Sequence, residues 1–409
     1  MRRDVLDGKN GVTMSSTVIE NVDRLMPRLE EVSVALHARP ELGHEEFFAH
    51  ELLTNTIEST GLPVQRHAFG TETGFMCEVG DSGLPTVAVL LEYDALPGIG
   101  HGCGHNIIAA AGLGAGLALA PMAREFGLRL RILGTPAEEG GGGKIIMARN
   151  GAFRDVDCAM MIHPADRDLI KMNTIAIQEL RAGYTGRAAH AASAPHEGRN
   201  ALDAAVLGYN AIAALRQHIR DSERIHGVFT HGGDKPNIVP DRAETLWYVR
   251  SDDLDTLAPL RGRVTRALEG AAMACDCQAN LEWADYAYAD MVDNAALNDR
   301  YSDLARAIGR EPASPRPDAR VVGSTDLGNI SHLVPSIHPM LAVAEAGTPL
   351  HTADFAAAAV GERATRAIRD GAVLLAQLAA AIGTDRTLRE TVFEGHQKPL
   401  EIRRILHTD

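Results

Sequence analysis

Short apolar segments alternate with helical patterns in the first half of the chain, and this alternation allows few folds. Thr86–Leu91 and Leu128–Leu133 are apolar and short, so each predicts a buried strand. Residues 107–120 between them are rich in Gly, Ala and Leu and predict a buried helix. A helix near 144–150 then leads to a third strand at Cys158–Ile162. Strands that alternate with helices form a mostly parallel sheet with helices on both faces, so we predict an α/β fold.

Helical patterns precede this region. Val18, Val22, Leu25 and Leu29 recur at helical spacing, and a second apolar pattern covers residues 45–57. The sequence therefore predicts two helices before the first buried strand.

Residues 179–290 follow a different order. The predicted elements run β-α-β-β-α-β, which is the ferredoxin-like arrangement of a small α+β unit. The strands are expected near 179–186, 225–231, 243–250 and 278–286, and the helices near 200–219 and 255–275. Strand–helix alternation resumes after residue 291, and a chain of 409 residues is long enough for two domains. We therefore expect one domain built from residues 1–178 and 292–409, with residues 179–291 inserted as a second.

Charge and composition exclude several classes of partner. The formal net charge of −14 argues against nucleic-acid binding and against polybasic attachment to lipid. No apolar segment follows the two N-terminal arginines, and the longest apolar stretch, 107–122, is shorter than the roughly 20 residues of a membrane span. Five widely scattered cysteines fit a reducing compartment better than a disulfide framework. We expect a cytoplasmic protein with neither nucleic acid nor membrane as a partner.

The segment His101-Gly-Cys103-Gly-His105 is the strongest chemical signal. Glycine allows tight turns, so the three side chains can point at one centre, and thiolate and imidazole are ligands for Zn²⁺, Mn²⁺, Co²⁺ or Ni²⁺. The alternative is a glycine-rich turn with incidental histidines. The segment lies between a predicted strand and a predicted helix, where open α/β sheets place their sites.

Two adjacent carboxylates, Glu138 and Glu139, follow the second predicted strand and precede four glycines. One can bind a metal while the other serves as a general base. The alternative is a solvated charged loop. The Gly-Gly-Lys144 that follows lacks the Ser or Thr of a phosphate-binding loop.

Two more histidines are candidates. His163 follows the third predicted strand, so it would lie at the same sheet edge as the two motifs above. His351 precedes a predicted helix, and its local sequence alone does not favour a functional role. Neither a Gly-x-Ser-x-Gly elbow nor a His-Glu-x-x-His motif is present in the sequence.

Together these motifs resemble the M20 metallopeptidases, and more narrowly their amidohydrolase branch of aminobenzoyl-glutamate hydrolases, auxin-conjugate hydrolases and aminoacylase-1-like-2 dipeptidases. The resemblance covers nearly the whole chain. It is carried by segments at 37–43, 92–97, 101–105, 136–143, 163, 189–192, 236–240, 323–326 and 351.

The resemblance implies a catalytic domain with two divalent metal ions, Zn²⁺ or Mn²⁺ first and Co²⁺ or Ni²⁺ as alternatives. It assigns Cys103 as the bridging ligand. It gives Glu138 the role of general base towards a metal-bridged water, and Asp94 the role of orienting a ligand. The remaining implied ligands are His105, His163, Glu139 and His351.

The inserted domain would be a lid that also forms a homodimer or higher homo-oligomer. By resemblance, His190 stabilises the oxyanion, from the same chain or a partner subunit. Asn237 and Arg250 would hold a substrate carboxylate, because guanidinium binds carboxylate in a bidentate fork.

The chain departs from many M20 peptidases at three positions. Glu92 stands where many have His, Cys103 where they have a bridging Asp, and Asn106 where much of the amidohydrolase branch has Asp. A thiolate bridge is open to oxidation and could leave one metal position weak, with His101 as a replacement ligand.

The expected reaction is hydrolysis of the amide C–N bond of an N-acyl amino acid or dipeptide-like substrate. Two alternatives stay open from the sequence. One is hydrolytic removal of an amino group from an aromatic ring, and the other is an inactive binding protein on the same scaffold.

Overall fold

The computed structural model describes residues 7–315 and 323–396, and the chain divides into two compact units. The first comprises the chain up to Asn173 and most of the chain after Met291. The second comprises Thr174–Asp290 together with Gly323 and Ser324. Residues 1–6, 316–322 and 397–409, which fall within the predicted first domain, lie outside the described residues.

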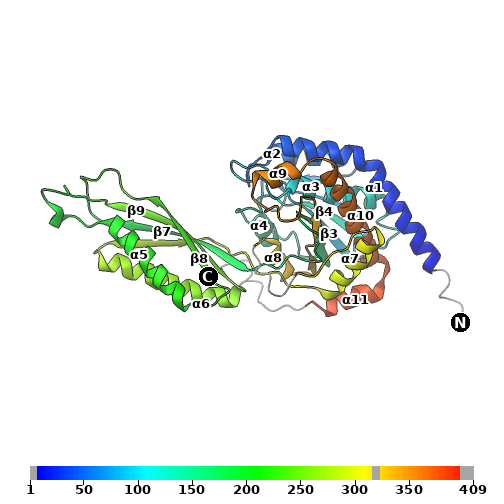
Figure 1. Ribbon diagram of the computed structural model, residues 1–409. Helices are drawn as coiled ribbons and strands as arrows, with labels where there is room; N and C mark the ends of the chain where they lie inside the picture. The colour runs from blue at the N-terminus through cyan, green and yellow to red at the C-terminus, as the bar shows by residue number, and fades with distance from the viewer. Residues whose placement is uncertain (1–6, 316–322, 397–409) are drawn as a thin grey trace. The chain divides into compact units, whose positions relative to one another are not determined.

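The first unit, in which Figure 1 labels the strands β3 and β4, is built on a six-stranded sheet of order β1-β2-β4-β3-β5-β11. Its four strands β4, β3, β5 and β11 are parallel, and β1 and β2 add an antiparallel edge. The prediction of a mixed α/β fold with a mostly parallel sheet is confirmed. The strands are β1 (Gln65–Arg66), β2 (Phe75–Val79), β3 (Thr86–Leu91), β4 (Arg129–Gly134), β5 (Cys158–Met160) and β11 (Ser336–Ile337).

The alternate residues of β3 show how both faces of this sheet are covered. Val87, Val89 and Leu91 pack into the core formed with α1, α3 and α10, whereas Ala88 and Leu90 pack towards α4 and α8. The helices of the unit are α1 (Asp7–Ala38), α2 (Phe47–Glu58), α3 (His105–Leu119), α4 (Gly143–Arg149), α7 (Ala295–Ala307), α8 (Leu327–Ser331), α9 (Ala353–Ala358), α10 (Glu362–Thr384) and α11 (Arg386–Glu394).

Helix α3 is buried along its whole length, as predicted for the apolar stretch. The segment His105–Met122, which contains α3, and the helix α10 are long and apolar enough to cross a membrane by length and composition, but 89% and 78% of their apolar windows are buried inside the fold. Burial on this scale is typical of the core helices of a globular unit.

The third predicted strand is shorter than expected. The strand β5 ends at Met160, and His163 begins a separate strand, β6 (His163–Ala165), which pairs in parallel with β12 (Met340–Ala342). The break places His163 at the start of a strand, and not directly after one.

The second unit has the element order β7-α5-β8-β9-α6-β10 and an antiparallel sheet of order β10-β7-β9-β8. Asn200 caps α5 by accepting from two backbone N–H groups, and Asp253 and Thr256 form a capping box at α6. The elements are β7 (Ala176–Thr185), α5 (Ala201–Leu215), β8 (Arg224–His231), β9 (Arg242–Ser251), α6 (Leu254–Ala274) and β10 (Gln278–Trp283).

Candidate metal centre

The motif at residues 101–105 folds into a tight turn at the start of α3. Gly104 adopts φ 73°, and a Cβ atom there would lie 2.9 Å from Pro164 Cγ. Only glycine therefore fits between Cys103 and His105 while the turn packs against the residue after His163. The backbone N–H of His351 also donates to Gly102 O at 3.0 Å, which ties the segment that carries His351 to the same turn.

Two groups of side chains with metal-ligating atoms share Cys103. Cys103, His105 and His163 form one group, and Cys103, Glu139 and His351 form the other, with the ligand atoms of each group within 4.8 Å of one another. The five candidate ligands of the first unit are therefore brought together in space. A third group, Glu92, His105 and Glu138, adjoins them.

The His105 ring is oriented by a carboxylate. Its Nδ1 lies 2.9 Å from Asp94 Oδ1, so Nδ1–H donates there and Nε2 is left as the ligand atom. The other oxygen of Asp94 accepts the backbone N–H of Glu139 at 2.9 Å. Burial alone would raise the pKa of Asp94, but His105 and this N–H lower it below its ordinary value.

The donor set fits a divalent cation. His105 Nε2 and Glu139 Oε1 are buried and have no hydrogen-bond partner among the described residues, which is costly unless another group satisfies them. His163 Nδ1 lies 2.7 Å from Pro164 O, so its Nε2 is likewise left as the ligand atom. Sulfur, imidazole and carboxylate donors around one space suit Zn²⁺, Mn²⁺ and related metals.

Glu138 is the carboxylate placed to act as a base. Its Oε2 lies 3.8 Å from His105 Nε2, and the residue is buried. Burial, then the charges of Glu92 and Glu139, raise its pKa well above the ordinary value. The preceding Ala137 has φ 57°, a conformation that non-glycine residues rarely adopt and that is common at functional sites.

His101 belongs to neither ligand group. It is buried with Nε2 3.2 Å from Leu36 O, and it lines a pocket of about 610 Å³ together with His37, Pro40 and Ile99. Burial, then the neighbouring His105, lowers its pKa to about 3. The described structure therefore does not support His101 as a replacement ligand.

Sequence reasoning missed a buried ion-pair cluster beside these groups. Lys144 Nζ contacts Glu92 Oε1 and lies 2.7 Å from Asp326 Oδ1, and all three side chains are fully buried. In the sequence, Lys144 draws notice only for a phosphate loop, and Glu92 only as a departure from related peptidases. The adjacency of Lys144 to the Glu138–Glu139 motif was the available signal.

Asn106 has a packing role in this fold. Its side-chain amide donates to Ser33 Oγ and to Ala359 O, both at 2.9 Å, and so ties α3 to α1 and to the loop after α9. An amide at this position supplies donors that a carboxylate would lack.

The three remaining candidates belong to the second unit. The loops that carry His190 and Asn237 lie side by side, because Ala191 N–H donates to Asn237 O at 3.0 Å. Both side chains are exposed, whereas Arg250 on β9 is half-buried and donates to Ser324 Oγ at 3.1 Å.

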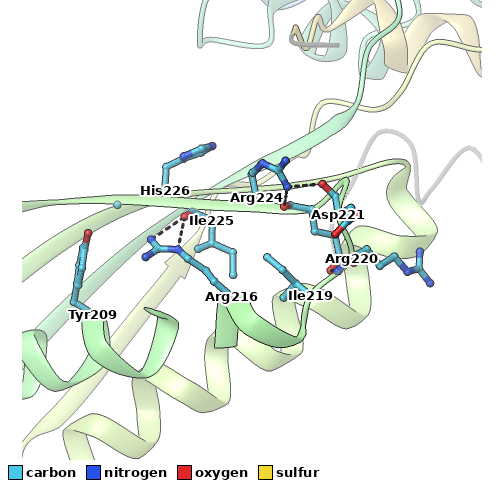
Figure 2. A pocket seen from close by; sticks show the side chains of 10 residues that line it. Tyr209, Arg216, Ile219, Arg220, Asp221, Arg224, Ile225 and His226 are labelled. Carbon is cyan, nitrogen blue, oxygen red and sulfur yellow. Dashed lines mark hydrogen bonds between the residues drawn. The ribbon is translucent and has the colours of Figure 1, made fainter. Parts of the chain in front are cut away.

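An open pocket in the second unit, drawn in Figure 2, contains none of these three residues. It measures about 560 Å³, and its lining includes Tyr209, Arg216, Arg224 and His226. The Arg216 guanidinium is already engaged with Ile225 O through two N–H groups, at 3.1 and 2.9 Å.

A Cys/His/Glu centre beside a buried carboxylate base, with Cys103 and Glu139 in segments that follow the parallel strands β3 and β4, defines a metal-dependent hydrolase. Comparison with known proteins gives the family. The model of the peptidase family M20/M25/M40 matches residues 86–380, and the chain belongs to this family.

Known relatives agree with this assignment. Xaa-Arg dipeptidase from Mus musculus is 36% identical, covering 95% of this chain and 93% of the mouse protein. A p-aminobenzoyl-glutamate hydrolase component from Escherichia coli is 35% identical over 60% of this chain and 55% of that protein. Among solved structures, a dinuclear metal-binding M20 peptidase from Bacillus subtilis has a TM-score of 0.66 at 19% identity, covering 88% and 99% of the two chains.

Proposed function

We propose that the protein hydrolyses the amide C–N bond of an N-acyl amino acid or dipeptide-like substrate. The main observation in support is that Glu138 lies beside two groups of candidate metal ligands that share Cys103. The mouse relative is named for a dipeptide and the Escherichia coli relative for an acylated glutamate, and both substrates contain this bond.

Two divalent ions are the proposed cofactors. Cys103, His105 and His163 would hold one, and Cys103, Glu139 and His351 would hold the other. When bound, such ions polarise a carbonyl and lower the pKa of water, and Zn²⁺ or Mn²⁺ suits these ligands. Cations bound at these positions would also offset the charges of Glu92 and Glu139, which together with burial raise the pKa of Glu138.

In the proposed reaction, Glu138 takes a proton from the attacking water and then donates it to the leaving amine. Asp94 contributes by holding the ring of His105 in one tautomer. Its contact with the Glu139 N–H also fixes the segment that carries the base.

We assign to the second unit the role of an inserted lid that binds substrate. His190 Nδ1 accepts the N–H groups of Ala192 and Ser193 at 3.2 Å, so its proton is on Nε2, where it can donate to a developing oxyanion. Arg250 has no carboxylate partner among the described residues, so it can hold a substrate carboxylate. Asn237 lies beyond the other end of β9, roughly 25 Å away along the strand, so it can share that carboxylate only from a partner subunit.

A homodimer through the second unit is also proposed. The strand β8 is an edge of its sheet, and its Val228 and Phe229 are 60% and 43% exposed. Val206 and Leu207 of α5 are exposed as well, and an apolar edge strand readily pairs with a second copy. We expect Val228→Lys to convert the dimer to a monomer in light scattering; an unchanged mass would contradict the dimer.

The test of the proposed function is a panel of N-acyl amino acids and dipeptides, with the products identified. We expect release of a free amino acid, loss of turnover after chelation, and recovery when Zn²⁺ or Mn²⁺ is added back. Metal-independent turnover would refute the proposal, as would turnover in Glu138→Ala equal to that of the native chain. Ammonia and a hydroxylated ring as the only products would point to a deaminase.

A further inference from the structure

Lys144 is a buried cation placed among acidic groups beside the candidate metal ligands. Its Nζ contacts Glu92 Oε1 and Asp326 Oδ1, and its backbone N–H donates to Asp326 Oδ2 at 2.8 Å. None of the three side chains is exposed. Ion pairs buried this deeply cost desolvation energy, and apolar clusters of the same volume often stabilise a fold equally well. Stability alone therefore does not account for the cluster.

The geometry of Glu92 indicates what the cluster does. Lys144 holds Oε1 of Glu92, and the other oxygen, Oε2, lies 3.5 Å from His105 Nε2. Oε2 is buried and has no hydrogen-bond partner among the described residues, and the same is true of His105 Nε2. Lys144 thus fixes Oε1 of Glu92. Oε2 lies beside His105 Nε2, so a metal ion bound to that nitrogen would also be close to Oε2.

The position of Lys144 in the fold makes this orientation rigid. Lys144 lies in the first turn of α4, and Asp326 immediately precedes α8. Asp326 accepts from both the side chain and the backbone of Lys144, so one carboxylate holds the ammonium group and the start of α4 together.

We propose that Lys144 is a positioning residue that aims Glu92 Oε2 at the metal position containing His105 and thereby sets the metal affinity of that position. Asp326 anchors Lys144 in this role. Partners behind metal ligands usually contribute about 10- to 100-fold to metal affinity, and we expect an effect of this size. The inference rests on the metal-binding role proposed for His105.

The test is a titration of metal-free protein with Zn²⁺ by chelator competition, combined with thermal unfolding. We expect Lys144→Met to lower the affinity of one site about 10- to 100-fold and to leave the second site unchanged. Glu92→Gln should weaken the same site, and Lys144→Arg should retain part of the affinity. The matched control is Lys171→Met, which removes a partly exposed lysine paired with Asp293 in the same unit.

A second variant separates positioning from stability, because Lys144→Met leaves two buried carboxylates unpaired. The triple variant Lys144→Met/Glu92→Gln/Asp326→Asn removes all three charges together. We expect its unfolding temperature to recover while the metal affinity stays low. Recovery of metal affinity along with stability would overturn the proposal. A native chain that binds no Zn²⁺ would instead refute the proposed function.

Discussion

The two ligand groups that share Cys103 differ in how far solvent reaches them. The His105 side chain is 1% exposed and His163 is buried, whereas the His351 side chain is 56% exposed. The difference extends to their supports. Asp94 holds the ring of His105, and a backbone carbonyl holds the ring of His163. Among the residues that the structure describes, the only polar contact of the His351 ring is with Glu139, at 3.6 Å.

This difference in burial and support indicates that the two metal positions of one centre differ in metal affinity. A ligand already fixed by packing and hydrogen bonds loses little freedom when a metal binds, whereas an exposed ring must be ordered first. We expect the position of His105 and His163 to bind metal more tightly than the position of Glu139 and His351.

The largest expected effect comes from the ligand common to both groups. Cys103→Ala should abolish metal binding at both positions and lower kcat/KM by about a thousandfold or more, since metal catalysis contributes several kcal/mol. Metal content by plasma mass spectrometry and steady-state kinetics measure this. Cys158→Ala, at a buried cysteine of β5, is the control, and native metal content in Cys103→Ala would show that the thiolate is not shared.

Glu138→Gln should separate catalysis from metal binding. We expect kcat to fall about 10²- to 10⁴-fold, the usual contribution of a general base, while both positions keep their metal. Glu125→Gln removes an exposed carboxylate and should leave kcat unchanged. A variant at Glu138 that loses metal as well as activity would identify this residue as a ligand.

Removing one histidine from each group tests whether the two positions differ in metal affinity. We expect His105→Ala to weaken metal binding at least about tenfold more than His351→Ala, a difference of about 1.4 kcal/mol in binding free energy. Calorimetric titration of the two metal-free variants gives both affinities. Equal losses would show that burial does not distinguish the two positions.

Asp94→Asn tests the support behind His105. The amide is a weaker acceptor for His105 Nδ1–H, so metal affinity should fall about 10- to 100-fold at that position. The loss should be smaller at the position of Glu139, whose backbone N–H also contacts Asp94. Asp81→Asn breaks an exposed pair with Arg124 and serves as the control. An equal loss of metal affinity at both positions would show that Asp94 does not act mainly through His105.

The smallest effect concerns His101, the histidine of the motif that belongs to neither group. Its folded pKa is about 3, below the ordinary value of 6.5, so between these values only the unfolded state binds the proton. Stability should therefore fall as pH drops below about 6.5, by at most about 1.4 kcal/mol per pH unit for this group. In urea unfolding of metal-free protein at pH 7 and 5.5, His101→Gln should reduce this loss, whereas the exposed His218→Gln should not.

The sequence predicted those parts of the fold that depend on local patterns. The apolar runs predicted β3 and β4, and the uninterrupted Gly/Ala/Leu composition predicted the buried helix α3. Both predictions hold because such apolar segments are stable only in the core. The short strands β6, β11 and β12 were not predicted. Each has two or three residues and exists only through its pairing with a distant partner.

The candidate site shows the same division. Cys103, His105 and Glu139 could be found from motifs, because glycine-flanked ligands next to strand ends leave a local signature. The pairing of Lys144 with Asp326 spans 182 residues and leaves no such signature. The exposure of His351 and the direction of His101 are likewise set by tertiary packing, which spacing alone does not reveal.

Anomalous X-ray diffraction from crystals supplied first with substoichiometric and then with excess Zn²⁺ would test the unequal centre most directly. We expect a first peak among Cys103, His105 and His163, and a second peak beside Glu139 and His351 only at excess metal. A first peak at the His351 group, or a single peak at all concentrations, would contradict two unequal positions that share Cys103.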